Sequence, residues 1–238
     1  MVNALEIRAA RADDHGNFLR LVPELAVDDP LPDFERWSSL VRPTMLIAEQ
    51  GGEAVGYTFY RPLGATMHLA HIVTAPSARR AGVGRALMAE TIRRGKAAGA
   101  TSLYLNVKPQ NERAIALYRS CGLAPVARTW AFRMPWATIE AHTAPYVNDV
   151  TPLAPSDDAE IERRHGLAAG LLASQRTQAG RELHAIGLET FASFDPGFGG
   201  ANPFGAASLD HVFSLLRALR PFARPEHEHI VFTIDDRP

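Results

Sequence analysis

The sequence predicts a mixed α/β (α+β) fold, in which a mostly antiparallel sheet is flanked by helices, followed by a smaller α/β domain. Two observations carry this prediction. Short apolar runs with strand-like alternation are interleaved with segments whose apolar residues recur at helical spacing. Two of the strand-like runs flank Gly51-Gly52, a dipeptide suited to the positive φ angles of a hairpin turn. Strands joined by so short a turn must be antiparallel.

Local signals place each element of the first half. Asp13 or Asp14 can cap the first helix, Pro76 ends a strand, and Gly99 and Gly122 each follow a helical pattern. The expected elements are a strand at residues 4–10, a helix at 11–25, a hairpin at 44–62, a strand at 65–76, a helix at 80–98, a strand at 101–107, a helix at 111–123 and a strand at 125–135.

Composition narrows the class of protein. The chain has 238 residues and a formal net charge of −1, which gives no general attraction to nucleic acid or to a membrane. The single cysteine, Cys121, excludes an internal disulfide and fits a reducing compartment. The first residues lack the apolar core of a signal peptide, and no apolar run approaches membrane-spanning length. We therefore expect a cytoplasmic protein without a metal.

The turn that opens the helix at residues 80–98 has the features of an anion site. A helix N-terminus offers unpaired N–H groups and a partial positive charge. Gly82 and Gly84 allow a phosphate to approach the backbone closely, and three arginines add charge. The third glycine of G-x-G-x-x-G is missing, and no Gly-Lys-Ser/Thr follows. The alternative is a plain helix start with small residues packed on a sheet.

Two motifs in this order resemble the GNAT superfamily of acyl-CoA N-acyltransferases. The pattern Arg79-x-x-Gly82-x-Gly84, directly after a strand, closely resembles the pyrophosphate loop of that superfamily. The segment 111–123 is similar to its N-x-x-A-x-x-L-Y-x-x-x-G-F helix, with Leu123 in place of the usual Phe. The matching positions of this second motif are Asn111, Ala114, Leu117, Tyr118 and Gly122. The resemblance covers residues 4–135.

The resemblance implies an N-acetyltransferase that moves the acetyl group of acetyl-CoA to a primary amine by direct attack in a ternary complex. Tyr118 looks like the general acid toward the departing sulfur; the alternative is a tyrosine packed on the sheet. Asn111 resembles the residue that contacts the pantetheine arm, or is only a helix cap. The residues expected to bind the coenzyme are Ile72 and Thr74 through their backbone, and Arg79, Arg80, Ala81, Gly82, Gly84, Arg85 and Asn111.

The general base is expected on the strand before the glycine turn. Many relatives carry a glutamate eight residues before the proline of that turn, and His68 stands there. A histidine near its ordinary pKa of about 6.5 suits base work at neutral pH, directly or through a water. Alternation places His68 on one face with Ala70 and Ile72, and His71 on the other face, unless the strand is bulged. A structural role for His68 is the alternative.

The sequence is compatible with two hypotheses about function. An enzyme would use a small-molecule or peptide amine as acceptor. A catalytically idle acyl-CoA-binding module, with the C-terminal half as an interaction surface, is the alternative. Cys121 ends a helix with no histidine near it in the sequence, so core packing is expected rather than a nucleophilic role. Sheet edges in such folds often pair between subunits, which would allow a homodimer.

The second half echoes the first without its glycine turn. We expect a GNAT-like domain at residues 1–135, a linker at 136–149, and a degenerate, truncated second copy or accessory α/β domain at 150–238. Residues 208–223 form an amphipathic helix capped by Ser208, and 229–235 a strand. Residues 194–205, rich in glycine and phenylalanine, are expected to be an irregular loop. The alternative is a flexible wall over the acceptor pocket of the first domain. No coenzyme site is expected here.

Overall fold

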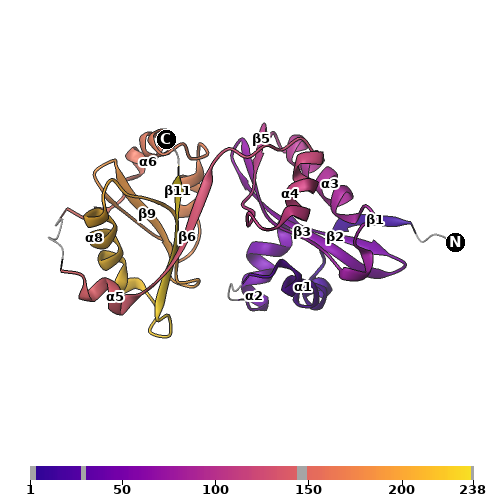
Figure 1. The fold of residues 1–238 in the computed structure, drawn as a ribbon, viewed down its shortest axis with the longest axis horizontal. Helices are drawn as coiled ribbons and strands as arrows, with labels where there is room; N and C mark the ends of the chain where they lie inside the picture. Colours follow the sequence, from indigo (N-terminus) through magenta and orange to yellow (C-terminus); the bar gives the residue numbers. More distant parts are fainter. Residues whose placement is uncertain (1–3, 28–30, 144–148, 237–238) are drawn as a thin grey trace. The chain divides into compact units, whose positions relative to one another are not determined.

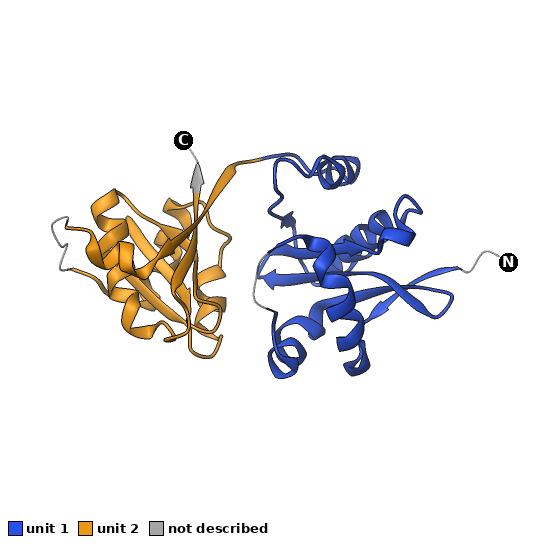
Figure 2. Cartoon of the chain, turned by 60° about the horizontal axis from the view of Figure 1, so that its bottom comes forward, with its two compact units in different colours: residues 1–125 blue, residues 126–238 orange. Residues whose placement is uncertain are grey.

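The chain folds into two compact units in the computed structural model, which describes residues 4–27, 31–143 and 149–236. Unit 1 comprises Met1–Pro125 and unit 2 comprises Val126–Pro238 (Figure 2). Each unit contains one sheet with helices against it (Figure 1). Within the described residues, no helix is long and apolar enough to cross a membrane.

The sheet of unit 1 has five strands in sequential order. The first four pair antiparallel and the fifth is parallel to the fourth. Gly51 and Gly52 turn between the second and third strands with φ values of 62° and 81°, which confirms the predicted hairpin. The strands are β1 (Leu5–Ala9), β2 (Met45–Gln50), β3 (Glu53–Leu63), β4 (Thr66–Thr74) and β5 (Ser102–Tyr104).

Helices cover both faces of this sheet, and a separate hydrophobic core lies on each face. Phe18 and Trp37 pack with Tyr57 on one face, whereas Val83 and Leu87 pack with Leu46 and its neighbours on the other. The helices are α1 (His15–Leu21), α2 (Phe34–Arg36), α3 (Val83–Ala97) and α4 (Glu112–Ser120), with 3-10 turns η1 (Ala12–Asp14), η2 (Val22–Leu25), η4 (Arg42–Thr44) and η5 (Pro76–Ala78) and a π-helical turn η3 (Trp37–Val41).

The fourth and fifth strands separate soon after they meet. Parallel pairing runs only from Thr66 opposite Ser102 to His68 opposite Tyr104, although β4 continues to Thr74. Among the described residues, no strand pairs with the outer edge of β4 at positions 69–74. Backbone polar groups along such an edge remain available to a ligand.

Unit 2 has a six-stranded sheet of order β6-β11-β10-β9-β8-β7. Its strands are β6 (Arg128–Pro135), β7 (Thr151–Pro152), β8 (Glu182–Ile186), β9 (Thr190–Asp195), β10 (Gly200–Gly205) and β11 (His229–Asp236). Its helices are α5 (Trp136–Ala141), α6 (Asp158–Arg164), α7 (Leu171–Arg176) and α8 (Leu209–Leu219), with turns η6 (Pro155–Asp157) and η7 (Arg220–Phe222). Ser208 caps α8 as predicted, since its Oγ accepts from His211 N at 3.2 Å.

The strands from β7 to β11 repeat the topology of unit 1. Three antiparallel pairs are followed by a parallel pair, β10 with β11, as in the run from β1 to β5. Helices lie between the first two strands and between the last two, again as in unit 1. The interpretation of residues 150–238 as a degenerate second copy stays a prediction from the sequence. The prediction of an irregular loop at 194–205 is wrong, because the end of β9 and the whole of β10 together occupy most of that segment.

The domain boundaries differ from those expected. The strand at 128–135 pairs along its whole length with β11 of unit 2, so the division falls after Pro125 rather than near residue 135. The expected linker begins as helix α5, whose Trp136 and Ile139 are buried in the core of unit 2. The polar and proline residues around Trp136 and Ile139 led to the prediction of a linker. Residues 144–148 of that expected linker lie outside the described residues.

Candidate functional site

The glycine loop, residues 75–84, joins the free edge of β4 to the start of α3. Arg79 is extended, Arg80 has a φ of 65°, and Gly82 has a φ of 84° immediately before the helix. The left-handed backbone at Gly82 is readily adopted only without a Cβ. The first helical hydrogen bond runs from Ala86 N to Gly82 O. The N–H groups that precede Ala86 in the first turn of α3 therefore have no partner within the helix. The loop thus presents donors and the positive end of a 15-residue helix.

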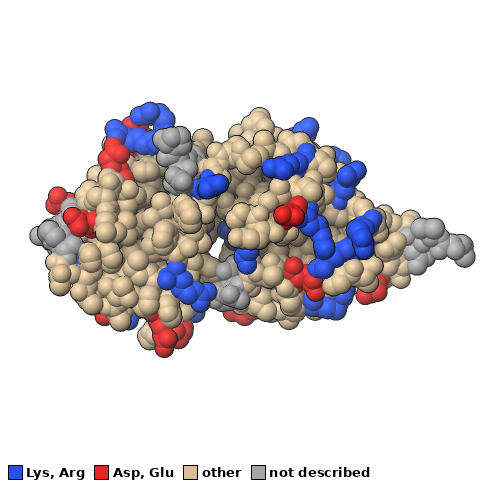
Figure 3. Space-filling model, in the orientation of Figure 1, with Lys and Arg blue, Asp and Glu red and all other residues tan. Residues whose placement is uncertain are grey.

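The three arginines of this region have different surroundings. Arg79 donates from Nε to Thr74 O at 3.4 Å and forms an ion pair with Glu24 of η2, so it fastens the loop to neighbouring elements. Arg85 places Nη2 3.5 Å from Ser120 Oγ at the end of α4. Arg80 is exposed. Lys and Arg side chains gather on the visible part of unit 1 that holds α3 (Figure 3).

Helix α4 brings Tyr118 and Asn111 into the same unit. Asn111 Oδ1 accepts from Ala114 N at 3.1 Å, so the side chain is a helix cap, as one of the two sequence-based alternatives has it. A Cβ on Gly84 would lie 3.2 Å from Leu117 Cδ2, so this glycine also permits close contact between α3 and α4. Tyr118 is half-buried, and burial raises its pKa to about 12. The phenol therefore keeps its proton at neutral pH and can donate it.

A bulge in β4 places the two histidines on one face. Phe59 pairs with His71 and Arg61 with His68, so three residues of β4 span two residues of β3. Ring contacts agree with this register: Phe59 lies 5.4 Å from His71 and 5.4 Å from the Arg61 guanidinium carbon. The bulge is the exception under which the sequence analysis allowed the two histidines to share a face. Ile72, which simple alternation groups with His68, packs on the opposite, α3-facing side of the sheet.

Burial and a neighbouring cation set the protonation of this pair. Burial and the Arg61 charge lower the pKa of His71 to about 4, and burial, Arg61 and His71 do the same for His68. Both imidazoles are thus neutral near pH 7. His68 stacks on Tyr104 of β5 at 4.7 Å between ring centroids. His71 has Tyr57 Oη 3.2 Å from its Nδ1.

Sequence reasoning did not identify Tyr57, Arg61, Tyr104 or Glu24 as part of this region. Tyr57, Phe59 and Arg61 occupy every second position of β3, so their side chains lie on one face of the sheet. That spacing was readable, but the partner strand and its register were not. Glu24 lies 55 residues from Arg79, and local sequence carries no sign of that pairing.

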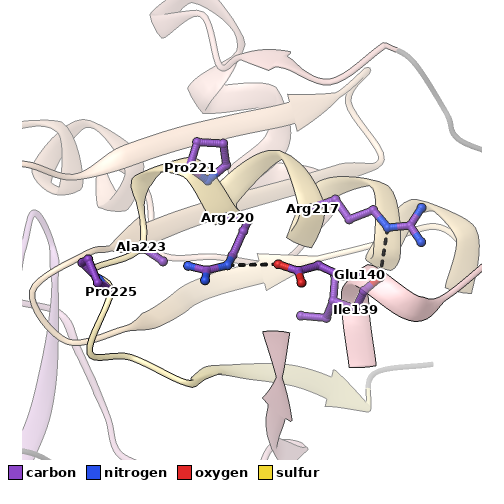
Figure 4. Close-up of a pocket in the computed structure, with 7 residues that line it drawn as sticks. All are labelled: Ile139, Glu140, Arg217, Arg220, Pro221, Ala223 and Pro225. Atoms are coloured by element: carbon purple, nitrogen blue, oxygen red, sulfur yellow. Dashed lines mark hydrogen bonds and ion pairs between the residues drawn. The ribbon is translucent and has the colours of Figure 1, made fainter. Parts of the chain in front are cut away.

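Unit 2 has an open hollow of about 680 Å³ beside α5 and α8 (Figure 4). Its arginines already serve the packing of these helices. Arg217 donates to Ile139 O at 2.9 Å, and Arg220 donates to Glu140 at 3.2 Å. Unit 2 also has only residues 206–208 between β10 and α8, where unit 1 has the glycine loop. We therefore place the candidate site in unit 1.

Unit 1 thus combines a split in a mixed sheet with a glycine-rich helix start. Residues 8–123 match the family model described as the Acetyltransferase (GNAT) family, and this segment belongs to that family. A comparison with curated protein sequences found no match.

Two solved structures resemble the whole chain. A protein of Pyrococcus horikoshii assigned as an acetyltransferase has 19% identity and a TM-score of 0.67, covering 97% of this chain and 79% of its own. The GCN5-related N-acetyltransferase of Sphaerobacter thermophilus has 14% identity and a TM-score of 0.64, covering 98% of this chain and 87% of its own. At these identities, the likeness establishes the fold, including both units.

Proposed function

We propose that the protein is an N-acetyltransferase that transfers the acetyl group of acetyl-CoA to a primary amine. The observation that carries the proposal is the juxtaposition of the free β4 edge at positions 69–74 with the glycine loop. An extended pantetheine arm would pair with the backbone of Ile72 and Thr74, and its pyrophosphate would meet the N–H groups at the start of α3. Family membership of residues 8–123 supports acyl transfer as the class of reaction.

The residues around this edge divide between the coenzyme and the reaction. Ala81, Gly82 and the first turn of α3 are proposed to hold the pyrophosphate, with Arg80 and Arg85 beside it. Arg79 is proposed to act mainly by fixing the loop, because its side chain is engaged by Glu24. Asn111 retains its amide N–H groups for the pantetheine while its carbonyl caps α4.

The proposed reaction forms one bond and breaks one. The neutral amine nitrogen attacks the thioester carbonyl, and the C–N bond forms. The nitrogen gives its proton to His68, directly or through a water; the C–S bond breaks, and the sulfur takes a proton from Tyr118. Exchange with solvent restores both residues. A lysine-type amine, with a pKa of about 10.4, must arrive deprotonated, because an imidazole whose pKa is about 4 cannot take the proton of an ammonium. After the C–N bond has formed, the attacking nitrogen is far more acidic, and the neutral His68 ring can accept its proton.

We place the acceptor on the histidine face of the sheet, between β4 and the α1 side. It is proposed to be a small-molecule or peptide amine. A cytoplasmic location and a homodimer remain hypotheses from the sequence.

The coenzyme assignment is tested by calorimetric titration of acetyl-CoA into wild type, Gly82→Glu and Gly99→Glu. Both glycines have positive φ, 84° and 87°, and neither would place a Cβ within 4 Å of another atom. The two variants therefore impose the same kind of backbone strain beyond opposite ends of α3, whose 15 residues span about 22 Å. We expect binding to wild type and Gly99→Glu, and loss of binding only in Gly82→Glu. Equal binding by all three would contradict the assignment.

Turnover separates an enzyme from an idle coenzyme-binding module. Wild type and Tyr118→Phe would be assayed for thiol release from acetyl-CoA with a panel of amines, with Tyr60→Phe as the control tyrosine. Tyr118→Phe is expected to lower kcat by 10- to 100-fold with unchanged acetyl-CoA affinity. Coenzyme binding without turnover of any amine would favour the idle module.

A further inference from the structure

The buried tyrosine beside His71 fixes the hydrogen-bonding role of that histidine. Tyr57 is fully buried on β3, and within the described residues the only hydrogen-bond partner of its hydroxyl is His71 Nδ1, at 3.2 Å. Burial raises the pKa of Tyr57 above its ordinary value, so its phenol remains protonated. A buried hydroxyl hydrogen without an acceptor would be costly, and His71 Nδ1 is the acceptor within reach.

His71 can accept that hydrogen only in one tautomer. Burial and Arg61 keep the ring neutral at pH 7, because they lower its pKa to about 4. A neutral imidazole has one N–H and one lone pair. If Nδ1 accepts from Tyr57, the hydrogen of His71 must be on Nε2. The opposite tautomer would place Nδ1–H against the phenol oxygen and leave the buried phenol hydrogen without a partner.

The remaining ring nitrogens face accessible space. Within the described residues, His71 Nε2 and both ring nitrogens of His68 make no hydrogen bond. None of the three is a fully buried atom without a partner, so each is reached by solvent. The β4 bulge puts the two rings on the same face. The same face therefore presents a fixed N–H donor from His71 beside an imidazole lone pair from His68.

We infer that Tyr57 is a positioning residue that locks His71 in the Nε2–H tautomer, so that His71 donates a hydrogen bond to the bound acceptor while His68 alone takes the proton. This inference rests on the proposed acyl transfer for its catalytic part, but the tautomer itself is a property of the unliganded protein. The expected acceptor is an amine with a hydrogen-bond-accepting oxygen near its amino group.

The groups that influence His71 come from several elements. Tyr57 and Arg61 face it from β3, and His68 adjoins it on β4. Tyr104 of β5 contacts His68. From η2, which packs against β4, Glu24 is ion-paired with Arg79. Thr58 Oγ1 donates to the His71 carbonyl at 2.9 Å, which holds the bulged backbone but leaves the ring to Tyr57.

The tautomer is tested directly on the full-length protein by long-range ¹H–¹⁵N correlation of labelled histidines at pH 7. His71→Gln would identify the His71 signals by their disappearance. We expect an unprotonated Nδ1 and a protonated Nε2 at His71. The reverse pattern would overturn the inference, whatever the enzyme activity.

A pair of tyrosine variants on β3 then tests the cause. Tyr57→Phe removes the donor to neutral His71, so its tautomers should mix and its pKa should rise by about one unit. Tyr60→Phe, on the α3-facing side of the same strand, should change neither. An unchanged His71 tautomer in folded Tyr57→Phe would overturn the positioning role.

The catalytic part is tested with an amine that wild type acetylates. Tyr57→Phe should lower kcat about tenfold, leave the KM for acetyl-CoA unchanged and shift the acid limb of the pH profile to higher pH, because protonation of His71, whose pKa is raised in this variant, then adds to that of His68. His68→Gln should remove that limb, whereas His71→Gln should keep it. If wild type acetylates no amine, the proposed function fails, and the nitrogen signals still decide the tautomer. An active Tyr57→Phe with a wild-type pH profile would refute the catalytic part.

Discussion

At Gly56, β3 lies close to the backbone of β4 and to side chains of α3, and replacement of this glycine by alanine tests the packing. A Cβ at Gly56 would lie 2.6 Å from the Val73 carbonyl oxygen and 3.1 Å from Val83 Cγ1. Ordinary van der Waals contact begins near 3.4 Å, so the β4 backbone would have to move away by about 0.8 Å to accommodate the new Cβ. Overpacking costs about 1–3 kcal/mol, and a backbone oxygen cannot rotate away as a side chain can. We expect Gly56→Ala to lower the free energy of unfolding of unit 1 by about 3 kcal/mol.

The assay must separate the two units, since a protein with two compact units need not unfold in one step. Of the three tryptophans, Trp37 lies in unit 1, and Trp130 and Trp136 lie in unit 2. Urea unfolding followed by ¹⁹F NMR of 5-fluorotryptophan therefore reports each unit. Gly56→Ala should lower the Trp37 midpoint by about 1–2 M urea and leave the other signals in place.

Gly16→Ala is the matched control in the same unit. A Cβ at Gly16 meets no atom within 4 Å, and the residue lies in α1. Replacing a helical glycine by alanine should leave the Trp37 midpoint unchanged or raise stability by up to about 1 kcal/mol. A wild-type midpoint in Gly56→Ala would refute the close-approach reasoning.

Three further predictions concern charge in unit 1. Arg61→Gln should raise the pKa values of His68 and His71 from about 4, because one cause of the lowering is removed; a fall on NMR titration would contradict the electrostatic account. Since both folded values lie below the ordinary 6.5, the stability of unit 1 should be complete above pH 6.5 and should decline as the pH falls through 4, less so in the double histidine-to-glutamine variant. Asp14→Asn should cost about 3 kcal/mol, because the buried carboxylate accepts hydrogen bonds at 2.6 and 3.0 Å from one guanidinium; the exposed Asp13→Asn should stay within about 0.5 kcal/mol of wild type in the same urea assay.

The sequence by itself determined the elements whose signals are local. The Gly51-Gly52 hairpin, the helix after Gly82 and the Asn111 and Ser208 caps each depend on a few consecutive residues, and each lies where the patterns put it. The family motifs could be recognised for the same reason, because the glycine loop and the Tyr118 helix are both short, contiguous segments.

Tertiary structure alone decided which strand pairs with which and in what register. The 128–135 strand looks the same in sequence whether it completes the first sheet or the second, and only pairing with β11 assigns it to unit 2. The β4 bulge has no signature in the residues around His68, yet it turns every following side chain to the other face and so brings His71 beside it. Local chemistry therefore names the candidate groups, and long-range hydrogen bonding decides which of them meet, because pairing energy depends on both strands at once.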